Sequence, residues 1–64
     1  MIVRLRQPRR EITVDGARTV NQLLDELGMN RESFLVIRNG TLVPADGRLA
    51  PDDTIEVRPV VSGG

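Results

Sequence analysis

One stretch of helical periodicity, set among runs of strand periodicity, most constrains how this chain can fold. The helical stretch carries four apolar residues at positions i, i+3, i+4 and i+7: Val20, Leu23, Leu24 and Leu27. Thr19 before it and Gln22 three residues later form a capping box, and Gly28 after it suits a left-handed C-terminal cap. Because so short a helix is unstable alone in water, its apolar stripe must pack against a sheet.

Strand signals surround this helix on both sides. Alternating or continuous apolar runs predict five strands, at residues 1–6, 11–14, 34–37, 41–43 and 54–58. Asn39-Gly40 is typical of a type I′ hairpin turn, since both residues tolerate positive φ. The order strand-strand-helix-strand-strand-strand predicts an α+β domain in which one helix crosses one face of a mixed sheet. The predicted core consists of Val3, Leu5, Ile12, Val14, Val20, Leu23, Leu24, Leu27, Leu35, Ile37, Leu49, Ile55 and Val57.

Composition restricts the chemistry. The 64 residues include no cysteine, histidine, lysine, tyrosine or tryptophan, which excludes disulfides, thiolate or imidazole metal sites, Schiff bases and Ser-His-Asp arrangements. Nine arginines balance nine acidic residues, and zero net charge argues against nucleic-acid or membrane-surface binding by counterion release. No apolar run approaches the roughly 20 residues of a spanning helix or forms a signal peptide, so we expect a cytoplasmic protein. A binding or carrier protein is favoured over an enzyme.

Acidic residues cluster before the last strand: Asp46, Asp52 and Asp53. Paired carboxylates can bind Mg²⁺ or serve in acid-base catalysis. The segment Pro51-Asp52-Asp53-Thr54 also fits a turn, in which aspartate accepts hydrogen bonds from nearby backbone. We predict that these aspartates are structural.

Arginines gather near both ends of the chain: Arg4, Arg6, Arg9, Arg10 and Arg58. Strand alternation places Arg4, Arg6 and Arg58 on the helix-free face of the sheet. They can form a patch for phosphate or for an acidic partner, or simply a solvated face that protects edge strands. Because neither lysines nor aromatic residues lie among them, direct nucleic-acid binding is disfavoured, and docking of an acidic partner is retained.

Apolar residues extend this predicted docking surface. Leu35 and Ile37 are expected to face the core, so Val36 has the opposite parity and is expected on the helix-free face. Phe34 either joins the margin of that surface or caps the end of the core. Exposed apolar residues ringed by arginine are typical of an interface. The complete predicted surface consists of Arg4, Arg6, Phe34, Val36, Arg38, Arg58, Val60 and Val61.

The sequence ends in Val60-Val61-Ser62-Gly63-Gly64. A glycine-rich end can be an unstructured extension or a remnant of cloning. Here it follows a strand, and its five residues reach about 17 Å when extended. Gly63 and Gly64 lack a Cβ, so their backbone can approach another molecule closely. We therefore predict a domain at residues 1–59 and a flexible tail at 60–64 whose terminal carboxylate reaches into a partner's active site.

Four segments together resemble one family. They are residues 19–24 at the start of the helix, 39–44 around the hairpin, 52–57 in the last strand and 61–64 at the end. Each match is weak alone, but a terminal di-glycine on a body of this strand order and length is specific. Over essentially its whole length the chain resembles the ubiquitin-like β-grasp sulfur carriers of the ThiS/MoaD group.

This resemblance implies a protein substrate rather than an enzyme, with Gly63 and Gly64 as its reactive end. An E1-like enzyme would adenylate the Gly64 carboxylate with ATP and Mg²⁺, so the carrier itself needs no bound cofactor. A sulfur donor, such as a cysteine desulfurase or a rhodanese-like protein, would then convert the adenylate to a thiocarboxylate. The sulfur would pass to a synthase acting on a small molecule or to a tRNA thiolase. No contact with a membrane is expected.

Within the family, the sequence is most similar to two branches. The molybdopterin-synthase subunits are longer and have an aromatic-rich first strand, which residues 1–6 lack. The thiamin carriers follow the hairpin with arginine and tryptophan, and Pro44-Ala45-Asp46-Gly47 departs from that. The short tRNA 2-thiolation carriers are similar in the start, the helix and the Ser-Gly-Gly end. Two other functions stay open: a non-catalytic ubiquitin-like interaction module, and a protein modifier conjugated through Gly64.

Overall fold

The computed structural model describes residues 1–6 and 9–60. Helix α1 (Val20–Leu27) forms where the apolar stripe predicts it. The Thr19 hydroxyl accepts a hydrogen bond from the Gln22 amide (3.2 Å), and the Gln22 side chain accepts one from the Thr19 amide (2.8 Å). Gly28 ends the helix with φ of 69°. The predicted capping box and C-terminal cap are therefore both confirmed. No helix in the described part of the chain is long and apolar enough to cross a membrane.

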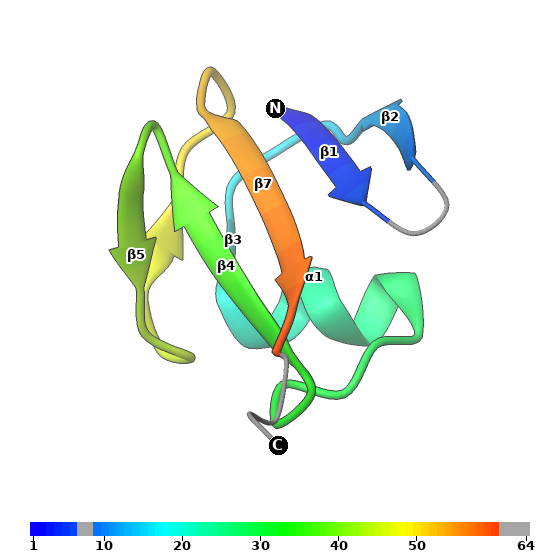
Figure 1. Cartoon of the computed structure of the whole chain (residues 1–64). Coiled ribbons are helices and arrows are strands. Elements are labelled where there is room, and N and C mark those ends of the chain that lie inside the picture. Colours follow the sequence, from blue (N-terminus) through cyan, green and yellow to red (C-terminus); the bar gives the residue numbers. More distant parts are fainter. Residues whose placement is uncertain (7–8, 61–64) are drawn as a thin grey trace.

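Five strands form one mixed sheet in the order β2-β1-β7-β4-β5. These strands are β1 (Ile2–Arg6), β2 (Arg9–Thr13), β4 (Phe34–Arg38), β5 (Thr41–Val43) and β7 (Thr54–Pro59). β1 and β7 are parallel, and the other neighbours are antiparallel. α1 lies across one face of the sheet, and we call the opposite, helix-free face the outer face (Figure 1). This arrangement is the predicted ubiquitin-like β-grasp.

A second, very short ladder holds the start of the helix. It pairs β3 (Arg18–Thr19) with β6 (Arg48–Leu49), and neither strand was predicted from the sequence. The amide of Val20 also donates to the carbonyl of Gly47 at 2.9 Å. Gly47 admits no side chain, because a Cβ there would collide with the side chain of Val43 and with the Pro44 carbonyl. This ladder fixes the first turn of α1 against the loop between β5 and β7.

The core lies between the helix and the sheet and largely matches the predicted set. Eight predicted residues are buried: Val3, Leu5, Val20, Leu23, Leu24, Leu49, Ile55 and Val57. Three more are half-buried and pack against them: Ile12, Val14 and Leu27. Met1 and Val36 are also buried, although the predicted core did not include them.

For β4, the sequence predicted the wrong set of side chains to face the core. Val36 is 2% exposed and belongs to the core, whereas Leu35 is 43% exposed and Ile37 is only half-buried. The cause is the pairing of β4 with β7, in which Val36 lies opposite Val57 and Leu35 opposite Arg58. Residues directly opposite each other share a face of a sheet. Val36 therefore points inward with Val57, and Leu35 points outward with Arg58.

Candidate functional site

The outer face carries the predicted arginines on the two central parallel strands. Arg4 and Arg6 of β1 and Arg58 of β7 are all exposed there, as alternation predicted. The Arg4 guanidinium pairs with Glu11 at 3.2 Å. Arg6 and Arg58 both pair with Glu56, at 3.1 and 2.6 Å. These contacts form a charged network across three adjacent strands.

Glu56 is the centre of this network. The hydrogen bond donated by Arg58 lowers the pKa of the Glu56 carboxyl from its ordinary value of 4.5; desolvation opposes it, and the hydrogen bond from Arg6 lowers the pKa further. The same contact raises the pKa of Arg58. Glu56 is therefore fully ionised at neutral pH and has no proton to donate. The network is suited to recognition of charge rather than to acid-base chemistry.

Three residues of the predicted docking surface, Phe34, Val36 and Arg38, lie on the helix side of the sheet. Val36 is in the core, as described above. Arg38 lies opposite Ile55 in the β4–β7 pairing, on the helix side of the sheet, and its Nε contacts the Asp53 carboxylate at 2.8 Å. Both corrections follow from the same shift of parity along β4.

Phe34 and the C-terminal residues complete the predicted surface. Phe34 is half-buried and packs against the core on the helix side, so of its two interpretations the core cap is confirmed. Val60 is 44% exposed and continues the outward parity of Arg58. Val61, Gly63 and Gly64 lie outside the described residues.

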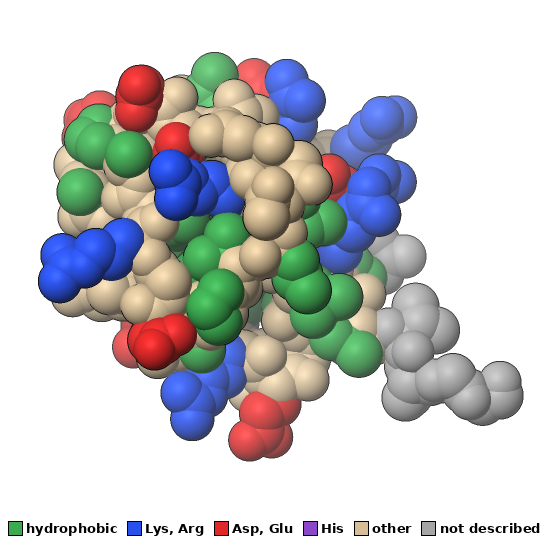
Figure 2. Space-filling model, turned by 90° about the vertical axis from the view of Figure 1, so that its left-hand side faces the viewer, with side chains coloured by type: hydrophobic (Ala, Val, Ile, Leu, Met, Phe, Trp, Pro, Cys, Tyr) green, Lys and Arg blue, Asp and Glu red, His purple; other side chains and the backbone are tan. Residues whose placement is uncertain are grey.

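Sequence reasoning missed three apolar residues on the outer face. Leu35 lies beside Arg58, and Ile37 lies between Glu56 and Leu42, which is 59% exposed. Together with Val60 they form a surface that we call the apolar strip: Leu35, Ile37, Leu42 and Val60. Figure 2 faces the β5 edge of the sheet and shows hydrophobic side chains exposed along that edge. No local signal in the run from Phe34 to Ile37 could have shown which residues face outward, because every residue in it is apolar.

The chain leaves the sheet beside this strip. The amide of Val60 donates to the carbonyl of Ser33 at 2.8 Å, one step beyond the last pair of β4 and β7. The predicted boundary between domain and tail fell at residue 59, and Val60 is still bonded to the body. The C-terminal segment therefore begins next to Leu35 and Arg58, with both the apolar strip and the charged network around its origin.

Within the acidic cluster before β7, the Asp53 side chain holds neighbouring segments together. Asp53 is 5% exposed, and its carboxylate accepts hydrogen bonds from the Ala50 amide (2.7 Å) and the Asn39 side chain (3.0 Å). Asn39 in turn accepts a hydrogen bond from the Thr54 amide, and it has the positive φ of 48° that the hairpin requires. In the described part of the chain, no three acidic side chains gather as metal ligands. The structural interpretation of Asp53 therefore agrees with its contacts.

The hydrogen bonds of the Asp53 carboxylate predict that the stability of the fold decreases in acid. The Ala50 amide, followed by Asn39 and Arg38 and opposed by burial, lowers the pKa of Asp53 from its ordinary value of 3.8. A carboxyl with a lowered folded-state pKa stabilises the fold above its ordinary pKa, and that stabilisation is lost as pH falls through the folded value. We expect the free energy of unfolding to fall below pH about 4, and to fall less in Asp53→Asn. Urea unfolding at several pH values measures the free energy of unfolding of the parent chain and of Asp53→Asn. The same dependence of this free energy on pH in both proteins would contradict the prediction.

The chain is similar to known proteins over its full length. The sequence model described as the ThiS family matches residues 2–64. The chain belongs to the ThiS family. It is also 38% identical over 65 residues to sulfur carrier protein TtuB of Thermus thermophilus, and the match covers all of both chains. The ThiS-family match thus includes the body, the apolar strip and the terminal Gly63-Gly64.

Proposed function

We propose that this ThiS-family chain is a sulfur carrier that is modified at its own C-terminus rather than an enzyme. The observation that carries the proposal is the match over its full length to sulfur carrier protein TtuB and to the ThiS family, with Gly63-Gly64 inside the matched region. The contacts of the outer face agree with this proposal, because its ion pairs and exposed apolar side chains are suited to recognition of a partner protein.

The proposed chemistry takes place on the Gly64 carboxylate. A carboxylate is a poor electrophile, so an E1-like enzyme first joins one of its oxygens to the α-phosphorus of ATP and releases pyrophosphate. Sulfide, or an equivalent sulfur donor, then attacks the carbonyl carbon, and AMP leaves with the electrons of the C–O bond. The product is a thiocarboxylate. ATP and Mg²⁺ belong to the partner enzyme, and the carrier supplies the carboxylate.

The geometry of the chain end supports this assignment. Val60 is the last described residue, and four residues follow it. Fully extended, four residues span at most about 14 Å, enough to enter an active site while the folded body remains outside. The apolar strip and Arg58 surround the origin of this segment and form the proposed contact with the activating enzyme. An interface with an apolar centre and a charged rim is the usual arrangement in protein complexes.

For the sulfur acceptor, we favour tRNA 2-thiolation over formation of the thiamin thiazole. The support is the similarity of the helix and of the Ser-Gly-Gly end to the short tRNA-thiolation carriers. Its downstream partner would then be a tRNA thiolase, and a cysteine desulfurase or rhodanese-like protein would supply the sulfur. Loss of 2-thiouridine from tRNA, without a thiamin requirement, is the expected phenotype of a deletion strain.

Intact-mass spectrometry tests the proposed function. The full chain is incubated with an E1-like enzyme from the same organism, ATP, Mg²⁺ and sulfide. We expect a product heavier by the difference between one sulfur and one oxygen atom, formed only when ATP is present. An unchanged mass would favour the non-catalytic interaction module. A covalent adduct to another protein through Gly64 would favour the protein modifier.

A further inference from the structure

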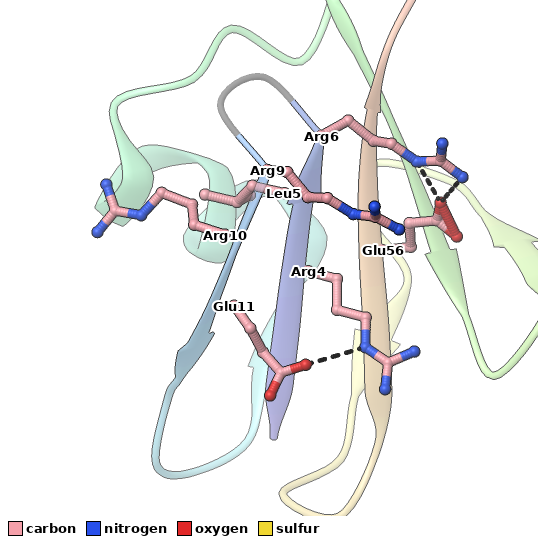
Figure 3. A pocket seen from close by; sticks show the side chains of 7 residues that line it. All are labelled: Arg4, Leu5, Arg6, Arg9, Arg10, Glu11 and Glu56. Carbon is pink, nitrogen blue, oxygen red and sulfur yellow. Dashed lines mark hydrogen bonds and ion pairs between the residues drawn. The ribbon is translucent and has the colours of Figure 1, made fainter.

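A second feature of the outer face lies beyond the apolar strip. A hollow of about 460 Å³ opens over β1 and β2, and we call it the arginine hollow. Its lining consists of Arg4, Leu5, Arg6, Arg9, Arg10, Glu11 and Glu56. Arg9 reaches over β1 between the side chains of Arg4 and Arg6, whereas Arg10 points away (Figure 3).

Around this hollow, the outer face carries more arginines than acidic residues. Four arginines lie on the outer face of β1, β2 and β7, against two glutamates that already pair with Arg4, Arg6 and Arg58. Within residues 1–6 and 9–60, no carboxylate lies at ion-pair distance from Arg9. Because the whole chain has no net charge, the compensating acidic residues must lie outside this face. The face therefore carries an excess of positive charge on a neutral protein.

The position of Arg9 is also unfavourable for the fold. In the β1–β2 pairing Arg9 lies directly opposite Arg6. Like charges directly opposite each other on one face of a sheet destabilise the pair. A glutamate at position 9 would pair better with Arg6. Arg9 therefore destabilises the strand pair, and it lies at a concave, exposed position. A residue that opposes the fold at such a position indicates a role in binding.

The existing contacts indicate which ligand fits. The chain's own carboxylates already occupy arginines of this face, at 2.6 to 3.2 Å. Carboxylates are therefore ligands that these guanidinium groups demonstrably accept. A nucleic acid is less well suited, because no aromatic side chain lines the hollow for base stacking.

The hollow also lies at the end of the sheet from which the C-terminal segment leaves. β1 runs parallel to β7, with Leu5 opposite Val57, so Arg6 and Arg9 lie level with Arg58. The C-terminal segment leaves from that same end. A protein that holds this segment can therefore reach the hollow.

We propose that the arginine hollow binds an acidic peptide segment of a partner protein, with Arg9 as its central contact. This is a second contact, separate from the apolar strip. Only the choice of the activating enzyme as the natural partner rests on the proposed function. Exposed charges of this kind mainly accelerate association and select the partner, so binding weakens as salt rises.

A titration of the isotope-labelled full chain tests this binding. The probes are a hexaglutamate peptide and hexauridylate, followed through the backbone amide and arginine Nε signals. We expect the peptide to shift signals of Arg4, Arg6 and Arg9, with binding weakened about tenfold in Arg9→Gln and unchanged in the control Arg31→Gln. An absence of peptide binding, equal weakening in both variants, or tighter binding of hexauridylate at the same residues would each overturn the proposal.

Two further measurements separate binding from folding and from activation. Arg9→Glu removes the repulsion with Arg6, so its Tm is expected to equal or exceed that of the parent chain while peptide binding is lost. With the activating enzyme, Arg9→Gln is expected to raise the KM for the carrier and leave kcat unchanged. A lowered Tm in Arg9→Glu contradicts the repulsion assigned to Arg6 and Arg9, and an unchanged KM in Arg9→Gln contradicts the choice of the activating enzyme as the partner. If the parent chain is not adenylated at all, the proposed function fails, and the peptide titration still decides whether the hollow binds acidic segments.

Discussion

Val36→Asp is expected to unfold the domain, whereas Leu35→Asp, one residue earlier in the same strand, is expected to leave it folded. Val36 is 2% exposed and packs in the core. Burial of a valine side chain contributes about 1.5–3 kcal/mol, and a buried, unpaired carboxylate costs several kcal/mol more. A core of this size supplies only about 3–5 kcal/mol in total. The substitution therefore exceeds the stability available.

Leu35→Asp is the matched control and also tests the apolar strip. Leu35 is 43% exposed and lies beside Arg58, so a carboxylate there remains hydrated and gains a cation nearby. We expect a Tm close to that of the parent chain and a higher KM in adenylation by the activating enzyme. Circular dichroism during heating and steady-state kinetics measure the two effects. A folded Val36→Asp or an unfolded Leu35→Asp would show that the parity of β4 is assigned wrongly.

The parts of the fold that the sequence predicted are those with strong local signals. The helix has an apolar stripe and caps at both ends, and the hairpin has Asn39-Gly40, which adopts the positive φ that its turn requires. Each of these signals is complete within a few residues. The alternation in β1 and β7 likewise shows directly that Arg4 and Arg58 face outward.

The parts that sequence reasoning missed depend on contacts between distant segments. Phe34 to Ile37 are all apolar, so no period-two pattern shows which of them face the core. Their parity is set by register with β7, some twenty residues later in the chain. Arg38 and Val36 were misplaced for this single reason. The β3–β6 ladder was missed because pairs of two residues have no periodicity.

Deletion of Gly64 is expected to abolish adenylation while leaving the fold intact. Among the described residues the core cluster extends no further along the chain than Val57, and Gly64 has no side chain to bury, so we expect the core to keep its stability. The shortened chain places its carboxylate about 3.5 Å short of the nucleotide. Because a displacement of about 1 Å from attack geometry already costs about 100-fold in rate, we expect a loss of at least that size.

Gly63→Val tests whether the chain end enters a narrow channel, as the proposed function requires. Its branched Cβ restricts χ1 and adds bulk where the proposed approach to the nucleotide is close. We expect a large loss of adenylation with an unchanged Tm. Ser62→Ala, which keeps both glycines and the position of the carboxylate, is the matched control and is expected to retain activity. A fully active Gly63→Val would show that the end of the chain is not held in a narrow channel.

ATP–pyrophosphate exchange, measured for the full chain and the Gly64 deletion with the same activating enzyme, tests the central claim most directly. The account predicts exchange that depends on the full chain, and a loss of at least about 100-fold for the deletion at equal Tm. Near-normal exchange by the deletion would show that the Gly64 carboxylate is not the reactive group, and the sulfur-carrier assignment would then be wrong.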